Sequence, residues 1–442
     1  MNNYETREKT YINNLSEMIQ METISVNDDL QIEKFLKFQE LLKKLFPNIF
    51  NACEFQEFEG SFLMKWKGLD SNKNPIMFMN HQDVVAPVGD WKYDPFSGKV
   101  AEGKLWGRGT LDDKGGLWGM LQAADELAAA GYVPPRDIYF ESACTEETSG
   151  YGADQISLWM QEQGIKLDMV LDEGGAIMYD PIGGAKGTFA MVGVGEKGCA
   201  EIKFIARGNG GHASTPGKNT PLVRLGKFME YVERRNLFDV EMTPTICEMF
   251  KRVGLYMGPA SKLLENPERI KHLLGALLPK LSNTANALVQ TTIAFTMAQG
   301  SDARNTIPAE AWVIGNMRFS HHQGQEDSIR VIRKAAKKFD LDMEILDPGF
   351  ESGMTDYNGY AFKLIEKAVK ETIPGVDDTV PYIQTGASDS RYFDRVCNQC
   401  LRFMPFKIDD QQLESIHGTN ESIDVSCLVP AVDFYRYLMQ NC

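Results

Sequence analysis

The sequence has few histidines and no concentration of basic residues. Its 442 residues include 46 lysines and arginines against 61 aspartates and glutamates, which gives a formal net charge of -15. A protein that binds the phosphates of nucleic acid needs clustered positive charge, so this composition argues against a nucleic-acid partner. Low-complexity tracts and internal repeats are also absent, and 43% hydrophobic and 24% charged residues are typical of a globular protein.

Long apolar runs are missing as well, because nowhere do 18 or more apolar residues follow one another. The first residues are polar and lead into a helical pattern rather than into the apolar core of a secretion signal. The eight cysteines lack the density of a secreted disulfide scaffold. The C-x-x-C pair Cys397 and Cys400 has no second pair to complete a structural zinc site, so chance explains its spacing. We therefore predict a cytoplasmic protein with free thiols and no membrane segment.

The order of apolar patterns predicts an α/β fold. Amphipathic helical runs at 4–21 and 30–45 open the chain, and a helical segment at 117–127 ends near Gly131. Short apolar runs that predict strands lie at 62–66, 76–79, 138–143 and 169–171. Alternation of such strands with helices is typical of a buried sheet that helices cover on both sides.

The middle of the chain has a different character. Strand-like runs at 200–206 and 288–297 flank a helical stretch rich in Met and Leu, roughly 221–280. We interpret residues 195–347 as an inserted α+β domain, since a chain of this length suits more than one core. The α/β domain would then consist of residues 1–194 and 348–442, with helices near 360–371 and 428–439.

Acidic residues and one histidine follow three of the predicted strands. The pairs are His81 and Asp83, Glu146 and Glu147, and Asp172 and Glu173. A zinc site needs histidine and carboxylate ligands from several elements, and the ends of neighbouring strands can supply them. Each pair alone is common at a polar strand end or on a solvated surface. Three such pairs together are harder to explain by chance, and they indicate a metal site.

Further candidates lie in glycine-rich turns. Asp112 belongs to the stretch 107–116, where by itself it would be read as the N-cap of the following helix. Only six histidines exist, and His212 and His417 lie in glycine-flanked turns. We interpret the other three, His272, His321 and His322, as structural or solvated residues.

Taken together, these stretches resemble the co-catalytic zinc peptidases that include carboxypeptidase S, the aminoacylases and the carnosinase-type dipeptidases, known as peptidase family M20. The resemblance runs from about residue 75 to 425 and rests on an ordered set of motifs. They are His81-Gln-Asp83, Gly107-Arg-Gly-Thr-Leu-Asp112-Asp-Lys114-Gly, Glu146-Glu147, Asp172-Glu-Gly-Gly, Gly211-His212, Asn305-Thr-Ile-Pro308 and His417-Gly-Thr-Asn-Glu421. Residues 171–175, 385–391 and 416–421 are most similar to the carboxypeptidase S branch.

The resemblance implies a zinc-exopeptidase-like catalytic domain with a central mixed sheet and two Zn²⁺ ions per chain, which Co²⁺ or Mn²⁺ would be able to replace. The ligands would be Asp112 as the bridge, His81 and Asp172 for one ion, and Glu147 and His417 for the other. Glu173 is the alternative to Asp172, because both acids end the same strand. Asp83 would orient His81, and Glu146 would be the general base that takes a proton from the attacking water.

The same resemblance makes the inserted domain a lid through which two chains would form a homodimer. His212 would stabilise the oxyanion, usually across the dimer interface. Asn305 and Arg318 would bind the carboxylate of the substrate, since an arginine fork meets a carboxylate with two hydrogen bonds. Gly386 and Ser388 would add further substrate contacts.

The predicted activity is hydrolysis of the amide bond of small peptides, of carboxypeptidase or dipeptidase type. An N-acyl amino acid hydrolase and an aminopeptidase stay open, because the shape of the pocket rather than the metal ligands selects the substrate. A non-catalytic homologue that binds amino acids is a further alternative. It is disfavoured because all five ligands and the base are present.

Overall fold

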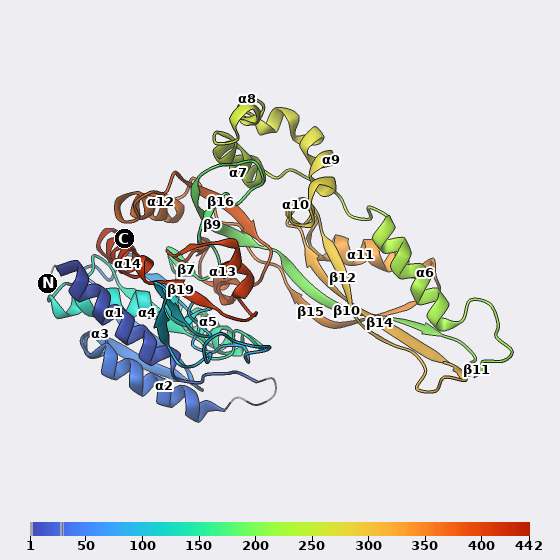
Figure 1. The fold of residues 1–442 in the computed structure, drawn as a ribbon, viewed down its shortest axis with the longest axis horizontal. Coiled ribbons are helices and arrows are strands. Elements are labelled where there is room, and N and C mark those ends of the chain that lie inside the picture. Colours follow the sequence, from blue (N-terminus) through green and yellow to red (C-terminus); the bar gives the residue numbers. More distant parts are fainter. Residues whose placement is uncertain (1–2, 27–28, 30) are drawn as a thin grey trace.

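The structure is a computed structural model that describes residues 3–26, 29 and 31–442. A ten-stranded mixed sheet lies on the side of both chain termini, and a four-stranded antiparallel sheet lies away from them (Figure 1). The large sheet has the order β1-β2-β6-β3-β7-β17-β9-β8-β18, and β16 pairs with β9. Its strands are β1 (Cys53–Phe58), β2 (Ser61–Trp66), β3 (Ile76–Met79), β6 (Ile138–Ser142), β7 (Met169–Asp172), β8 (Ile177–Tyr179), β9 (Thr188–Glu196), β16 (Asp378–Gln384), β17 (Cys400–Arg402) and β18 (Lys407–Ile408). The predicted α/β fold with a central mixed sheet is confirmed.

Helices cover both faces of the large sheet. The side chains of β3 alternate, so that Ile76 and Phe78 join one apolar core while Met77 and Met79 join the core on the opposite face. The first core includes residues of α1 (Asn3–Ile19), α2 (Ile32–Leu45), α3 (Pro47–Ala52), α4 (Lys114–Ala129), α12 (Tyr360–Thr372) and α14 (Leu428–Asn441). The second includes α5 (Tyr151–Glu162) and the 3-10 helix η3 (Asp389–Arg395). Leu30, where the second helix was expected to begin, lies outside the described residues. None of the described helices is long and apolar enough to cross a membrane.

Three neighbouring strands of the large sheet run in the same direction. β3 pairs in parallel with β6 on one side and with β7 on the other. Their carboxyl ends therefore meet at one edge of the sheet, and the residues that follow them are brought together there. A small sheet of β4 (Lys99–Ala101), β5 (Lys104–Trp106) and β19 (Ser422–Asp424) belongs to the same half of the molecule, with α13 (Asp410–Ser415) and η4 (Val425–Cys427) beside β19 in the chain.

The inserted segment forms the second sheet. It contains β10 (Gly198–Arg207), β12 (Thr292–Gln299), β14 (Glu310–Phe319) and β15 (Asp342–Phe350), in the order β12-β14-β10-β15. The helices α6 (Pro221–Arg234) and α11 (Gly324–Lys337) pack on one face of it. The short strands β11 (Gly211–His212) and β13 (Thr306–Ile307) lie at its outer end (Figure 1). The chain crosses between the two sheets at Lys197, which separates β9 from β10.

A helical insertion, residues 244–289, connects α6 to β12. It consists of α7 (Pro244–Gly254), η1 (Gly258–Ala260), α8 (Ser261–Leu264), η2 (Pro267–Ile270), α9 (Lys271–Leu281) and α10 (Asn283–Val289). Its apolar residues share a core with β9 and β16, which belong to the large sheet. Arg252 holds the contact through an ion pair with Glu366 at 2.7 Å. The helical part of the predicted inserted domain therefore packs against the large sheet, and strand β12 begins at Thr292 rather than at 288 because α10 extends to Val289.

Candidate metal centre

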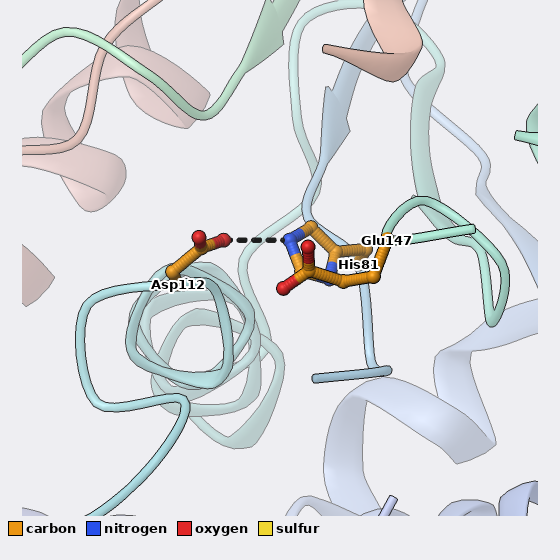
Figure 2. Close-up of side chains that lie close together, drawn as sticks. All are labelled: His81, Asp112 and Glu147. Atoms are coloured by element: carbon orange, nitrogen blue, oxygen red, sulfur yellow. Dashed lines mark hydrogen bonds and ion pairs between the residues drawn. The ribbon is translucent and has the colours of Figure 1, made fainter. Parts of the chain in front are cut away.

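Side chains from the ends of β3 and β6 and from the turn before α4 converge on one point. Figure 2 shows His81, Asp112 and Glu147 pointing toward one another. One ligand atom from each of these three residues lies within 4.8 Å of the other two. A second such group consists of His81, Glu146 and Glu173, which adds the end of β7. The parallel strands thus bring together residues that are up to 92 positions apart in the chain.

Asp112 stands between two histidines. Its Oδ1 lies 2.9 Å from His81 Nε2, and its Oδ2 lies 3.0 Å from His417 Nε2. The same nitrogen of His417 is 2.9 Å from Glu147 Oε2. The two oxygens of a single carboxylate therefore face two separate groups of ligands, which is the arrangement that a bridging carboxylate between two cations requires.

Asp83 fixes the positions of its neighbours. Its Oδ1 is 3.3 Å from His81 Nδ1, and its carbonyl oxygen is 2.9 Å from the same nitrogen. Its carboxylate also accepts backbone hydrogen bonds from Glu146 and Glu147, at 3.2 and 3.1 Å. Asp83 therefore orients the imidazole and ties the turn after β6 to the end of β3.

The adjacent acids Asp172 and Glu173 point in different directions. Asp172 Oδ2 accepts a hydrogen bond of 2.7 Å from the backbone nitrogen of Ser390, and Asp172 belongs to neither group of potential ligands. Glu173 Oε1 instead lies 3.8 Å from His81 Nε2. Of the two acids that the sequence left open, Glu173 is the one that belongs to a group of potential ligands.

The charges of the centre are unbalanced without a cation. Burial raises the pKa of the Glu146 and Glu173 carboxyls well above their usual range, with repulsion from other acids adding to it. Burial would also raise the pKa of Asp112, but hydrogen bonds from His417 and His81 outweigh it and lower that pKa. The bonds to Asp112 and Glu147 raise the pKa of His417 to about 10. Glu147 Oε1 is buried without a hydrogen-bond partner among the described residues. These donor groups therefore fit metal ions. Without metal, protonated imidazoles balance the negative charge of the carboxylates, and bound cations would take over that role.

The loop after β16 reaches the same edge of the sheet. Ser388 is buried, and its hydroxyl donates to Glu196 Oε2 at 2.9 Å. Ser390, two residues on, makes the contact with Asp172 described above. Gly386 is exposed at the start of this loop. The structure thus attaches the predicted substrate loop to the end of β7, beside the predicted metal ligands.

The predicted lid residues lie apart from this centre in the same chain. His212 is exposed in β11, where its Nδ1 lies 2.6 Å from the hydroxyl of Ser214. Asn305 is its neighbour, since the carbonyl oxygen of Asn305 accepts a hydrogen bond from the nitrogen of Ala213 at 2.8 Å. His212 belongs to β11, which lies at the outer end of the four-stranded sheet in Figure 1, and Asn305 is bonded to the residue that follows His212. Arg318 is half-buried near the base of that sheet, where it pairs with Cys199 and donates to Asn316.

The comparison with known proteins agrees with this geometry. Residues 77–441 match the family described as peptidase family M20/M25/M40. The chain belongs to this family. It is therefore a hydrolase of amide bonds, the chemistry of peptidase family M20/M25/M40 depends on metal, and the cluster of His81, Asp112 and Glu147 could hold a metal ion.

Two curated relatives span most of the chain. The N-fatty-acyl-amino acid synthase/hydrolase PM20D1 of Xenopus tropicalis is 30% identical over 446 residues, which cover 99% of this chain and 86% of the relative. Carboxypeptidase S of Saccharomyces cerevisiae is 27% identical over 462 residues, which cover 92% of this chain and 78% of the relative. The predicted resemblance to the family, including carboxypeptidase S, is confirmed.

Solved structures share the fold. The metallo-carboxypeptidase Sso-CP2 from Sulfolobus solfataricus superposes with a TM-score of 0.70 at 17% identity, over 97% of this chain and 98% of that one. Human carnosine dipeptidase 1 superposes with a TM-score of 0.67 at 15% identity, over 98% and 96%. At these identities the likeness shows that the arrangement of both sheets is common to the M20 fold.

Two residues of the M20 motifs support the centre in ways that the sequence did not reveal. The carboxylate of Glu421 accepts backbone hydrogen bonds from Leu111 at 2.7 Å and from Asp112 at 3.2 Å. Arg108 compensates its charge with an ion pair of 2.6 Å, and both side chains are buried. Glu421 therefore holds the loop that carries Asp112. Arg108 and Glu421 both belong to the motifs found in the sequence. Their roles became visible only in the fold, which brings Glu421 next to Asp112, 309 positions away in the chain.

Proposed function

We propose that this chain is a two-zinc hydrolase that cleaves the amide bond of a small peptide. His81, Asp112 and Glu173 would hold one ion, and Asp112, Glu147 and His417 the other. The observation that carries the proposal is the placement of Asp112, whose two oxygens each face a different histidine at 2.9 and 3.0 Å. Two-metal sites use such a bridge to keep both ions within reach of one reacting group.

When bound, the ions would polarise the scissile carbonyl and increase the acidity of a water molecule. Glu146 is the proposed general base. It lies in the group formed with His81 and Glu173, but it is not needed to complete either set of ligands. Burial raises its pKa, so its carboxylate is well suited to take a proton from water and to return it to the leaving amine.

Asp83 is the proposed positioning residue for His81. Its hydrogen bonds fix the imidazole with Nε2 toward Asp112 and hold the turn that carries the base. Rotation of that ring would remove a ligand from one ion, so Asp83 acts on the chemistry through His81.

We further propose that two chains associate through the lid. His212 and Asn305 are both exposed at β11, at the outer end of the four-stranded sheet and away from the metal centre of their own chain, where they would be able to reach the metal centre of a partner chain. β12 is an edge strand of that sheet, and its Met297 is 58% exposed, which makes this edge a candidate contact. Arg318 at the base of the sheet would bind the substrate carboxylate together with Asn305, and Gly386 and Ser388 would line the same site.

A second candidate is hydrolysis of N-acyl amino acids. The match to the N-fatty-acyl-amino acid synthase/hydrolase over 99% of the chain favours it. Both candidates attack an amide bond beside an amino acid with a free carboxylate. The proposal also includes a cytoplasmic location, supported by eight cysteines that are all free, as is usual in reducing compartments.

A substrate panel distinguishes these functions. The purified chain would be assayed with dipeptides, with peptides blocked at either end, and with short- and long-chain N-acyl amino acids, each with added Zn²⁺, Co²⁺ or Mn²⁺. Cleavage of peptides with a free carboxyl end supports the peptidase, and preference for acyl chains supports the second candidate. Absence of cleavage with every substrate and metal would refute both and leave a non-catalytic binding protein.

A further inference from the structure

Gln384 occupies the last position of β16, where the substrate loop begins. It pairs with Glu196 of β9, and its carbonyl oxygen accepts a hydrogen bond of 2.9 Å from the nitrogen of Lys197. Its backbone is thus fixed at the point where the chain crosses from the large sheet to the lid. The side chain is only partly buried, so that a ligand can reach it.

The carboxamide of Gln384 lies against the residue that follows Glu173. A Cβ atom on Gly174 would meet Gln384 Oε1 at 2.0 Å and Nε2 at 2.7 Å. Gly174 also has a φ of 120°, which L side chains rarely adopt. On the other side, Nε2 lies 3.9 Å from the position of a Cβ on Gly386. The carboxamide therefore extends from the proposed metal ligand to the proposed substrate loop, and the glycine at 174 leaves it the space to do so.

A neighbouring tyrosine sets the orientation of the carboxamide. The hydroxyl of Tyr382, two residues earlier on the same face of β16, donates to Gln384 Oε1 at 3.4 Å. The Nε2 group has two protons to donate, and within the described part of the chain it makes no hydrogen bond to a protein acceptor. The donor side of Gln384 is thus available to a ligand.

The three acids of the centre supply no such donor. Glu146, Glu147 and Glu173 offer only acceptor oxygens when they are ionised, and they repel an anionic substrate group. A carboxylate that enters between the metal ligands and Gly386 consequently needs a donor on this side, and Gln384 Nε2 supplies a neutral one.

We propose that Gln384 is a further substrate-positioning and specificity-determining residue, whose Nε2 donates a hydrogen bond to the free carboxylate of the substrate. This inference rests on the proposed function, which supplies an amide substrate with that carboxylate. Gln384 acts by holding the substrate and takes no part in proton transfer. Its contribution is therefore expected in KM more than in kcat, and only for substrates that carry the charge.

The test compares N-acetyl-leucine and glycyl-leucine with their C-terminal carboxamides. In Gln384→Glu the new charge repels a carboxylate, so KM for the acids should rise about 10- to 100-fold, the size of one hydrogen bond to a charged group. KM for the carboxamides should change far less. Gln384→Met removes the donor without adding charge and should raise KM for the acids by a smaller factor, as should Tyr382→Phe, which frees the carboxamide to turn. Gln163→Glu, at the exposed end of α5, adds the same charge elsewhere and serves as the control.

Metal content is measured for each variant. If Gln384→Glu binds less metal, Gln384→Met decides, because it adds no charge beside Glu173. An equal change of KM for acids and carboxamides in Gln384→Met, or no change for either, would overturn the inference. Failure of the unaltered chain to cleave any of the four substrates would instead count against the proposed peptidase and acylase functions, so that the two failures are distinguishable.

Discussion

Replacing Glu173 with glutamine tests which of the two acids at the end of β7, Asp172 or Glu173, binds metal. Glu173 Oε1 lies 3.8 Å from His81 Nε2, whereas Asp172 is occupied by the backbone of Ser390. An amide is a poor metal ligand compared with a carboxylate. Loss of an outer hydrogen-bond partner costs about 10- to 100-fold in metal affinity, so loss of a direct ligand should cost more than about 100-fold for one of the two ions.

In the metal-free protein, Glu173→Gln should not reduce the thermal stability. Burial raises the pKa of Glu173, and the charge of Asp112 adds to it, which means that the ionised form is unfavourable there without a cation. Glu173→Gln removes that charge and should leave the thermal midpoint of the metal-free protein unchanged or higher. A residue that only supported the fold would lower it.

Asp172→Asn is the matched variant. The oxygen of asparagine can accept the hydrogen bond from Ser390, so both ions should bind nearly as before, with a cost to stability of about 1 to 3 kcal/mol at most. Metal affinity is measured by competition with a chromophoric chelator, and metal per chain by elemental analysis. If Asp172→Asn loses one ion and Glu173→Gln keeps both, the ligand assignment is wrong.

Four further perturbations test the rest of the centre. Glu146→Gln should keep both metals but lose about 10²- to 10⁴-fold in kcat, measured at saturating substrate, and near-normal turnover would place the base elsewhere. A chelator should abolish activity and leave the fold intact. In this metal-free protein the bonds of His417 raise its pKa to about 10 from 6.5, so the stability that they give should be complete below about pH 6.5 and disappear as the pH rises through 10. A thermal midpoint of the metal-free protein that does not fall over this pH range contradicts the assignment. Co-expressing His212→Ala with Glu146→Gln should restore part of the activity in hybrid dimers, because one site then has both groups, and no recovery in verified hybrids would exclude a role across the interface. Arg318→Ala should raise KM for substrates with a free carboxylate more than it lowers kcat, and an equal effect on carboxamide substrates would argue against carboxylate binding.

The sequence determined most of the metal centre, because a local pattern controls it. Short apolar runs at 76–79, 138–143 and 169–171 form parallel strands β3, β6 and β7, and the carboxyl ends of parallel strands meet at one edge. Any polar residues that follow such strands are brought together there. The grouping of His81 with Glu147 follows from this pattern, whereas Asp112, in the turn before α4, was expected there only from the family resemblance.

Other features depended on the tertiary structure. Neighbouring residues at a strand end point in different directions, so the different contacts of Asp172 and Glu173 depend on the position of β7 and of the loop that carries Ser390. The apolar pattern of residues 244–289 predicts buried helices but does not indicate which sheet they cover. Only the packing in the structure places them on β9 and β16. Glu421 stabilises the Asp112 loop across 309 residues of chain, a contact that no local pattern encodes. Local sequence decides which residues end each strand, whereas long-range packing decides which of their side chains face the same site.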